Sequence, residues 1–396
     1  MMNWSSKIKQ CVTVQSLLLV LCGLAGCTFV GDSSHPGEAA VENHHAVRSS
    51  PLEMDWIGPS PDGLHFIEKQ SGRRFVAWGV NYDHDDEGRL LEDYWQQWDV
   101  VEEDFREIKS LGANVVRIHL QLGQFMRTAE EPNSLSLDYL RRLVRLAESS
   151  GLYLDITGLA CYHKARTPAW YDALNESRRW EVQARFWQAV ASVCARSPSI
   201  FCYDLMNEPV LPGANKIETD WLLGEFGGSH FVQRISLDLA GRSREEVARA
   251  WIDTLTTAIR SQDTRHMITV GVIPWAMVFP KAKPIFYAEQ VGGNLDFVSV
   301  HVYPEKGQVD NAIEALKVYN IGKPLVVEEM FPLKCSIEEM DDFINASRDF
   351  TDGWMSFYWG KTIEQYQKQQ TISGAIRSSW LTYFRTKSVE MVTTHP

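Results

Sequence analysis

Basic residues are too few in this sequence to form a nucleic-acid-binding surface. The chain of 396 residues has 39 Lys and Arg against 51 Asp and Glu, which gives a formal net charge of −12 at pH 7. Binding to DNA or RNA requires clustered Lys and Arg that neutralise phosphates. No basic stripe occurs here. This argues against a nucleic-acid partner and suits an enzyme outside the cytoplasm that acts on a neutral substrate.

Cysteine is also scarce and does not form a zinc-binding pattern. Of the 7 cysteines, Cys11 and Cys22 lie in an N-terminal apolar segment. Those beyond Cys27 are widely and irregularly spaced, namely Cys161, Cys194, Cys202 and Cys335. Such spacing does not match a zinc motif. Export would permit disulfides, but no pairing follows from the spacing, and four buried thiols are the simpler expectation.

Long hydrophobic runs are missing except near the N-terminus. An apolar stretch that includes Leu17–Leu21 follows Lys7 and Lys9. It is too short for a comfortable membrane span, so we expect residues 1–26 to be a cleaved export signal. The segment ends in Leu24-Ala25-Gly26-Cys27, which resembles a bacterial lipobox. That resemblance implies lipidation of Cys27 and a membrane anchor without a spanning helix, at the periplasmic or cell surface.

The rest of the chain predicts one linker and one domain. Residues 27–51 are polar and poor in aromatic residues, as in a flexible linker. From residue 52 onward the sequence is rich in apolar and aromatic residues and shows no internal repeat and no second linker. We therefore expect residues 52–396 to form a single catalytic domain of ordinary size for a barrel.

Strand and helix signals alternate through this domain. Eight apolar runs read as strands, at Phe75–Asn81, Asn114–Leu120, Leu152–Ile156, Ile200–Met206, Met267–Gly271, Phe297–His301, Leu325–Glu328 and Trp354–Trp359. Continuous apolar runs separated by helices are typical of buried parallel strands. This predicts a single (β/α)8 TIM barrel. An open doubly wound sheet would show a glycine-rich turn after the first strand, and Gly79-Val80-Asn81-Tyr82 does not fit that fingerprint.

Two of the predicted strands end in glutamate. Asn207-Glu208-Pro209 closes the fourth strand, and Glu328-Glu329 closes the seventh. A (β/α)8 barrel places its chemistry at the carboxyl ends of its strands. Two carboxylates that face each other across a pocket are what the cleavage of a glycosidic bond requires.

These motifs resemble glycoside hydrolase family 5, and the resemblance covers the domain from Val76 to Trp359. It implies that Glu208 is the acid/base and that Glu329 is the nucleophile. Glu328 is the rival for the second role, because the family's aromatic residue and glycine after the nucleophile are replaced here by Met330 and Phe331. Strand alternation predicts that only one of the two adjacent glutamates points into the barrel.

The resemblance implies roles for further positions. Arg117 corresponds to an arginine that supports the nucleophile, and Asn207 to a residue that bonds the sugar 2-hydroxyl. His301 and Tyr303 match a pair beside the carboxylates. Trp359 matches the platform under the sugar. Taken singly, each position has a structural alternative, such as a core histidine or a core tryptophan.

One departure concerns the third strand. Where many members have a histidine two residues after an aspartate, this chain has Thr157 after Asp155. His163, a little further on, is a candidate to replace it from the loop. The departure leaves the sugar open.

Substrate contacts are also expected from the loops at the mouth. Candidate stacking residues are Tyr82, Trp95, Trp98, Trp170, Trp221 and Trp275. Residues 211–243 form an insertion after the fourth strand that is expected to wall the cleft.

The leading hypothesis is a monomeric, lipid-anchored, retaining glycoside hydrolase that cleaves a β-glucan or β-mannan with two glutamates and without cofactor or metal. An alternative is a catalytically inactive, cell-surface carbohydrate-binding lipoprotein on the same barrel. A metal-dependent barrel hydrolase is disfavoured, because the first strand has no His-x-His pair.

Overall fold

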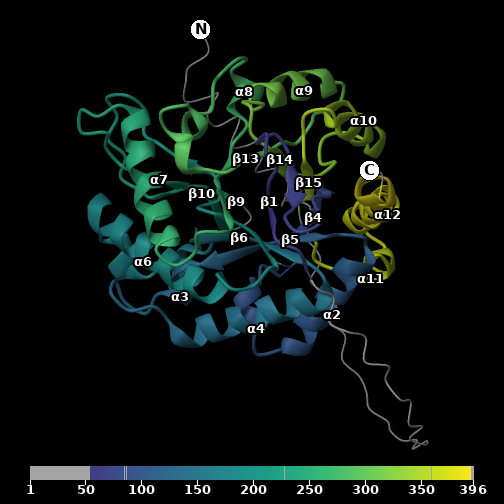
Figure 1. The fold of residues 1–396 in the computed structure, drawn as a ribbon, viewed down its shortest axis with the longest axis horizontal. Helices are drawn as coiled ribbons and strands as arrows, with labels where there is room; N and C mark the ends of the chain where they lie inside the picture. Colours follow the sequence, from purple (N-terminus) through teal and green to yellow (C-terminus); the bar gives the residue numbers. More distant parts are fainter. Residues whose placement is uncertain (1–53, 84, 86, 227, 358, 394–396) are drawn as a thin grey trace, which may run out of the picture.

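The computed structural model describes residues 54–393 except 84, 86, 227 and 358. The expected signal segment, Cys27 and the linker therefore lie outside the described residues. Figure 1 shows a central barrel of strands ringed by helices.

A closed parallel sheet forms the centre of the molecule. Its nine strands are β4 (Ala77–Tyr82), β5 (Val115–Gln121), β6 (Tyr153–Ala160), β7 (Ile200–Asp204), β11 (Met267–Thr269), β12 (Gly271–Val272), β13 (Val298–His301), β14 (Leu325–Met330) and β15 (Gly353–Ser356). They follow the order β11-β7-β6-β5-β4-β15-β14-β13-β12, with parallel neighbours. Because β11 and β12 are separated only by Val270, they act as two halves of one strand that closes the ring. The (β/α)8 barrel is confirmed.

Helices cover the outside of this barrel. The longer ones are α2 (Trp98–Ser110), α4 (Ser134–Ser150), α6 (Glu176–Cys194), α7 (Arg244–Arg260), α9 (Val309–Lys317), α10 (Ile337–Ser347) and α12 (Ile372–Thr393). Local sequence sets their ends. In α4, for example, the Asn133 side chain accepts from the Leu135 N–H at the start, and Gly151 adopts a φ of 61° at the end.

Short segments complete the connections between strands. They are η2 (Leu91–Tyr94), α3 (Leu122–Phe125), η3 (Lys164–Arg166), α5 (Ala169–Asp172), α8 (Trp275–Val278), η4 (Ile285–Tyr287), η5 (Gly292–Asn294) and α11 (Ile363–Lys368). Between β12 and β13 only α8, η4 and η5 occur, so this one connection carries no long covering helix.

A small antiparallel sheet closes the N-terminal end of the barrel. It consists of β1 (Ile57–Pro59), β2 (Phe66–Glu68) and β3 (Arg74–Phe75), in the order β1-β2-β3. Phe66 is fully buried, and its ring centroid lies 5.1 Å from Phe201 and 5.2 Å from Phe297. This apolar plug leaves the opposite, C-terminal end of the barrel for polar side chains.

A second small sheet stands over the C-terminal end. It contains β8 (Pro209–Val210), β9 (Leu222–Phe226) and β10 (Ser229–Arg234), with β10 in the middle. Hydrogen bonds tie it to the barrel rim: the His230 N–H donates to the Tyr162 carbonyl at 2.8 Å, Gln233 Nε2 donates to the Leu159 carbonyl at 2.9 Å, and Asn207 Nδ2 donates to the Phe231 carbonyl at 2.9 Å. The expected insertion of residues 211–243 thus lies beside the mouth.

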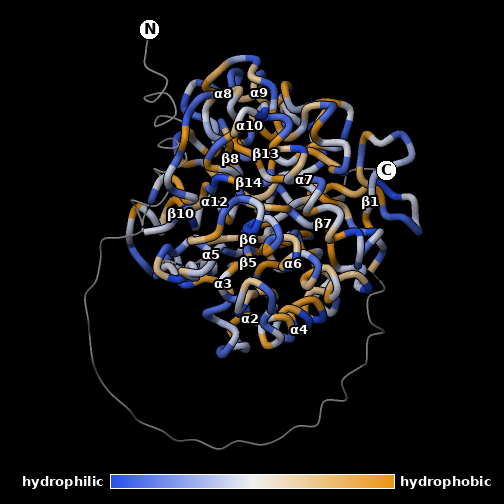
Figure 2. The backbone as a smooth tube through the Cα atoms, turned by 90° about the vertical axis from the view of Figure 1, so that its left-hand side faces the viewer, coloured by the Kyte–Doolittle hydropathy of each residue, from blue (hydrophilic) through white to orange (hydrophobic). Residues whose placement is uncertain are grey.

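The polarity of the chain follows this architecture. Figure 2 shows hydrophobic segments gathered in the middle of the molecule and hydrophilic ones mainly in its projecting loops. Among the described residues, no helix combines the length and the apolar character needed to cross a bilayer. The four cysteines of the described chain are free thiols, and all but Cys335 are buried.

The plug yields a stability prediction. Replacing the buried Phe66 by Ala removes its ring contacts and leaves a cavity, so the free energy of unfolding should fall by about 3–5 kcal/mol in urea titrations. Leu64, which is 45% exposed in the same segment, is the control. Leu64→Ala should change stability by no more than about 0.5 kcal/mol. Equal effects of the two variants would contradict a packing role for the plug.

Candidate active site

The carboxyl groups of Glu208 and Glu329 meet at the C-terminal end of the barrel. Glu208 lies shortly after β7, and Glu329 belongs to β14. One oxygen from each, together with a ring nitrogen of His301, lie within 4.8 Å of one another. Glu208 has a φ of 47°, a left-handed value that non-glycine residues rarely adopt. Its N–H donates to the Gly271 carbonyl at 2.9 Å, which helps hold this unfavourable conformation.

Arg117 is the buried cation at the centre of the site. From β5, its Nη1 donates to Glu329 Oε1 at 2.6 Å. Its Nη2 donates to Asp204 Oδ2 at 2.8 Å and to Asn207 Oδ1 at 2.9 Å. Burial opposes the charge, but the carboxylates of Glu328, Asp204 and Glu329 keep the pKa of Arg117 well above its usual value. The guanidinium therefore joins the ends of three different strands.

Both adjacent glutamates of β14 point into the barrel. The register between β13 and β14 shifts there, since Val300 pairs with Val327 whereas His301 pairs with Glu329. Glu328 Oε2 lies 3.4 Å from Arg117 Nη2, and Glu329 Oε1 lies 2.6 Å from Nη1. The expectation that alternation admits only one of them is wrong, because a bulge interrupts the alternation.

The two glutamates nevertheless have different surroundings. Glu328 is fully buried, whereas Glu329 is 5% exposed and accepts from Tyr303 Oη at 2.7 Å. The attraction of Arg117 and the bond from His301 outweigh the cost of burial and lower the pKa of Glu328 to about 2. Glu329 therefore lies at the mouth, and Glu328 lies one layer below it.

His301 bridges the two sides of the site. Its Nδ1 lies 2.8 Å from Glu208 Oε1, and its Nε2 lies 3.3 Å from Glu328 Oε2. Burial alone would lower the pKa of His301, but the carboxylates of Glu329, Glu208 and Glu328 raise it to about 10. A protonated ring donates from both nitrogens and has no lone pair to offer a metal. The proximity of Glu208, His301 and Glu329 would otherwise suit a cation.

The environment of Glu208 favours its protonated form. Burial is the main cause that raises the pKa of this carboxyl, and the charge of Glu329 adds to it, whereas the bond from His301 acts in the opposite direction. A carboxyl group with a raised pKa can donate a proton near neutral pH.

The sequence did not single out two neighbours of this group, His119 and Tyr162. His119 lies two residues after Arg117 on β5, so the period of a strand places both on one face. Its Nε2 lies 3.2 Å from Asn81 Oδ1, and its Nδ1 bonds the Tyr162 hydroxyl. That spacing of two was the available signal for His119.

Thr157 and His163 do not play the part expected for a third-strand histidine. Thr157 donates to Asp204 Oδ2 at 2.8 Å and so supports the fourth strand. His163 bonds the Gly88 carbonyl at 2.9 Å, in the loop after β4.

Trp359 lies beside the group of polar residues. It is 2% exposed, and its ring centroid lies 5.9 Å from that of Tyr82. Both residues line a small hollow with Asp83 and Asp85.

Most of the other aromatic candidates pack within the protein. Trp95 stacks on Tyr139 with centroids 5.1 Å apart. Arg142 covers Trp98, and Arg179 covers Trp221. Trp170 and Trp275 remain half-buried. Aromatic residues in these connections therefore serve mainly to pack loops onto helices.

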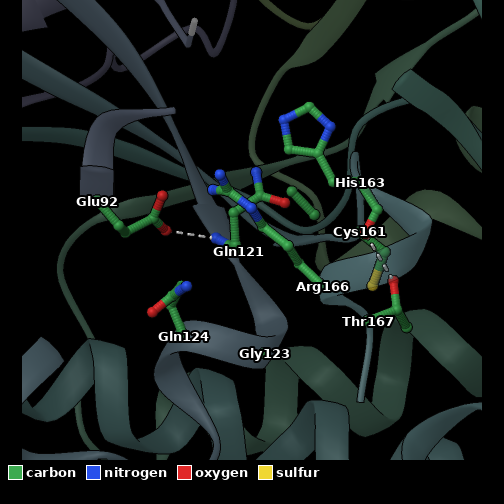
Figure 3. A pocket seen from close by; sticks show the side chains of 9 residues that line it. Glu92, Gln121, Gly123, Gln124, Cys161, His163, Arg166 and Thr167 are labelled. Atoms are coloured by element: carbon green, nitrogen blue, oxygen red, sulfur yellow. Dashed lines mark hydrogen bonds between the residues drawn. The ribbon is translucent and has the colours of Figure 1, made fainter. Parts of the chain in front are cut away.

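A second hollow lies among the loops that follow β4, β5 and β6. Figure 3 shows Glu92 on one side and Cys161, His163 and Thr167 on the other. The Gln121 N–H donates to Glu92 Oε1 at 2.7 Å, but Glu92 Oε2 is buried without a hydrogen-bond partner among the described residues. Burial is the main cause that raises the pKa of Glu92 to about 7.

This burial predicts a pH-dependent stability. Because the pKa of folded Glu92 exceeds its unfolded value near 4.5, its ionisation weakens the fold as pH rises from about 4.5 to about 7. Glu92→Gln should therefore increase the free energy of unfolding at pH 8 by at most about 3 kcal/mol, which a higher melting temperature would reveal. It should give no such gain at pH 4.5. The exposed Glu87→Gln is the control. A gain of the same size at both pH values would exclude this cause.

Comparison with known proteins supports a carbohydrate-active family. The model of the cellulase family (glycosyl hydrolase family 5) matches residues 79–388. Mannan endo-1,4-beta-mannosidase A of Podospora anserina is 27% identical over 267 residues, which cover 60% of this chain and 62% of that protein. Mannan endo-1,4-beta-mannosidase 5 of Arabidopsis thaliana is 29% identical over 121 residues, 27% of this chain and 22% of that protein. The chain thus spans less than two thirds of these relatives.

Solved structures share the fold. An exo-beta-1,4-mannosidase from Opitutaceae bacterium strain TAV5 superimposes with a TM-score of 0.61 at 16% identity, over 83% of this chain and 62% of that one. A beta-mannanase from the mussel Mytilus edulis gives 0.55 at 14% identity, over 86% and 98%. At these identities the likeness concerns the barrel alone. Since the family model covers nearly the whole barrel, the chain belongs to glycosyl hydrolase family 5.

Proposed function

We propose that this protein is a retaining glycoside hydrolase that cleaves β-linked glycans, with β-1,4-mannan as the first candidate substrate. The observation that carries the proposal is the meeting of Glu208 and Glu329, whose carboxylate oxygens lie within 4.8 Å. Retaining enzymes hold their two carboxyl groups about 5–5.5 Å apart, whereas inverting enzymes need about 6.5–9.5 Å to admit a water. The short separation supports double displacement.

In the first step Glu329 attacks the anomeric carbon while the glycosidic bond breaks. Arg117 and Tyr303 each donate to one oxygen of Glu329 and so orient the carboxylate. Glu208 gives its proton to the departing glycosidic oxygen, which leaves as a hydroxyl. The product is a glycosyl ester of Glu329.

In the second step a water molecule resolves this ester. Glu208, now ionised, takes a proton from the water. The water oxygen attacks the anomeric carbon at the same time, and Glu329 leaves as a carboxylate. Glu208 regains its proton, and the sugar keeps its original anomeric configuration.

Other residues bind the sugar in this proposal. Asn207 uses one amide hydrogen for the Phe231 carbonyl, at 2.9 Å, and offers the other to the sugar 2-hydroxyl. Trp359 forms the platform for the sugar ring. No residue in this scheme requires a cofactor.

The names of the relatives support the choice of substrate. Those from Podospora and Arabidopsis are mannan endo-1,4-beta-mannosidases, whereas the family model bears the name cellulase. A β-mannan is therefore the first candidate and a β-glucan the second. An inactive sugar-binding barrel is not favoured, since both carboxyl groups are present and meet.

We further propose that the protein is exported and held at a bacterial membrane by a lipid on Cys27, as a monomer. Small residues before Cys27 and the apolar run that precedes them support this assignment. Residues 1–26 would be removed, and residues 27–51 would tether the barrel.

The first test is hydrolysis of β-mannan, β-glucan and xylan by the protein and its Glu329→Gln and Glu208→Gln variants. Glu329→Gln should abolish turnover, because the amide cannot form the ester. Glu208→Gln should slow polymer cleavage by about 10²–10⁴-fold. The same variant should lose much less activity on an activated aryl β-mannoside than on the polymer, because the aryl leaving group needs no proton.

The matched control is Glu338→Gln, an exposed glutamate in the first turn of α10, which should leave activity unchanged. Proton NMR of the first-formed product gives the stereochemistry. Inversion of the anomeric configuration, or full activity of Glu329→Gln, would refute the mechanism.

The second test concerns the anchor. Radiolabelled palmitate should enter the full-length protein in bacterial cells and not its Cys27→Ser variant, and the variant should leave the membrane fraction. Membrane retention of unlabelled Cys27→Ser would count against lipidation.

A further inference from the structure

Glu328 is a carboxylate of the site that the two-step mechanism does not use. It is fully buried and lies 3.4 Å from Arg117 Nη2 and 3.3 Å from His301 Nε2. A buried carboxylate is costly unless it is paired. The bulge in β14 turns Glu328 inward. Burying its charge there costs more free energy than burying an apolar side chain would.

Gly271, at the start of β12, leaves room for this carboxylate. A Cβ on Gly271 would lie 2.4 Å from Glu328 Oε2, 2.8 Å from His301 Nε2 and 3.2 Å from Arg117 Nη2. Any larger residue at the start of β12 would displace the group. The bare backbone of Gly271 thus keeps Glu328 and His301 in direct contact.

Asp155 of β6 is a further carboxyl group near Glu328, and it is fully buried. Burial, and then the charge of Glu328, raise the pKa of Asp155 well above its usual value, whereas the charge of Arg117 acts in the opposite direction. The neutral form of Asp155 is therefore favoured beside the anionic Glu328.

The charged groups around His301 come from three strand ends. Glu208 faces Nδ1 from the end of β7, and Glu328 and Glu329 approach from β14, at 3.3 Å and 3.4 Å. Arg117 and His119 of β5 lie nearby, and burial followed by the charge of Arg117 keeps the pKa of His119 low. Among the described residues, only Glu328 forms an ion pair with His301 Nε2, so the charge on this side of the ring depends on it.

We propose that Glu328 is a positioning residue that holds His301 as an imidazolium, so that the other ring nitrogen donates to the acid/base Glu208. This role rests on the proposed function of Glu208. When Glu208 gives up its proton to the leaving group, the N–H of His301 meets the new carboxylate at Nδ1. The bond stabilises the product form of the acid and therefore makes Glu208 a stronger acid toward poor leaving groups.

The decisive measurement is the protonation of His301 by NMR of ¹⁵N-labelled imidazoles. In the wild type the ring should remain protonated on both nitrogens from pH 6 to pH 9. In Glu328→Gln, which keeps the shape and removes the charge, His301 should titrate within that range. The His301 signals are assigned by their loss in His301→Gln.

The kinetic counterpart separates positioning from folding. Glu328→Gln should lower kcat for β-mannan by about 10- to 100-fold, the value of a charge-assisted hydrogen bond, and lower it much less for an activated aryl mannoside. An equal loss on both substrates would indicate a general structural defect and would overturn the proposal. Asp155→Asn is the matched control, because it replaces a carboxyl group whose neutral form is favoured by a neutral amide of the same shape and should leave His301 protonated.

A second variant covers the case in which Glu328→Gln does not fold. Gly271→Ala changes no titratable group but pushes a methyl group against Glu328 Oε2, and it should also allow His301 to titrate below pH 9. A wild-type His301 that is neutral at pH 7, or a Glu328→Gln protein whose His301 stays protonated to pH 9, would refute the role of Glu328. If the wild type cleaves no glycan, the proposed function fails, whereas these NMR results still decide the link between Glu328 and His301.

Discussion

The site depends on one buried cation, the guanidinium of Arg117. Its Nη1 reaches Glu329, and its Nη2 reaches Asp204 and, at longer range, Glu328. Carboxylates removed from water repel one another and favour their neutral forms unless a positive charge lies among them. A short cation could not serve three strands at once, whereas the planar fork of arginine can. The convergence of β5, β7 and β14 at the barrel mouth is thus an electrostatic arrangement as much as a packing one.

The strand that is divided into β11 and β12 makes several contacts with this cluster. Between β11 and β12 the pairing changes sides, and Gly271 lies at the break. Its N–H donates to Asp204 Oδ1 at 2.8 Å, and its carbonyl accepts from the Glu208 N–H at 2.9 Å. The same residue leaves room for Glu328. One glycine therefore helps orient an acid that pairs with Arg117, holds the left-handed backbone of Glu208 and admits a second buried glutamate.

How far the sequence predicts this arrangement depends on whether a feature is local. Strand and helix signals alternate locally, and they predict the barrel and the meeting of Glu208 with Glu329. These local signals do not predict features that are set by the pairing of neighbouring strands. The bulge that turns Glu328 inward arises from pairing between β13 and β14, and β6 continues to Ala160 beyond its expected end at Ile156. Residues such as Trp95 satisfy a pattern for loop aromatics, but contacts with distant helices bury them.

The charge balance of the site bears on the chemistry it can support. Five carboxyl groups converge there, from Asp155, Asp204, Glu208, Glu328 and Glu329, against the two cations Arg117 and His301. Burial raises the pKa of Asp155, Asp204 and Glu208, so the neutral forms of these three carboxyl groups are favoured relative to free side chains. The pKa of Glu328 is instead lowered to about 2, which keeps its charge beside the two cations. The transition state of the proposed glycosidic cleavage carries positive charge at the sugar ring. Glu329, at the exposed end of the cluster, places a carboxylate where it complements that transition state better than a neutral group would.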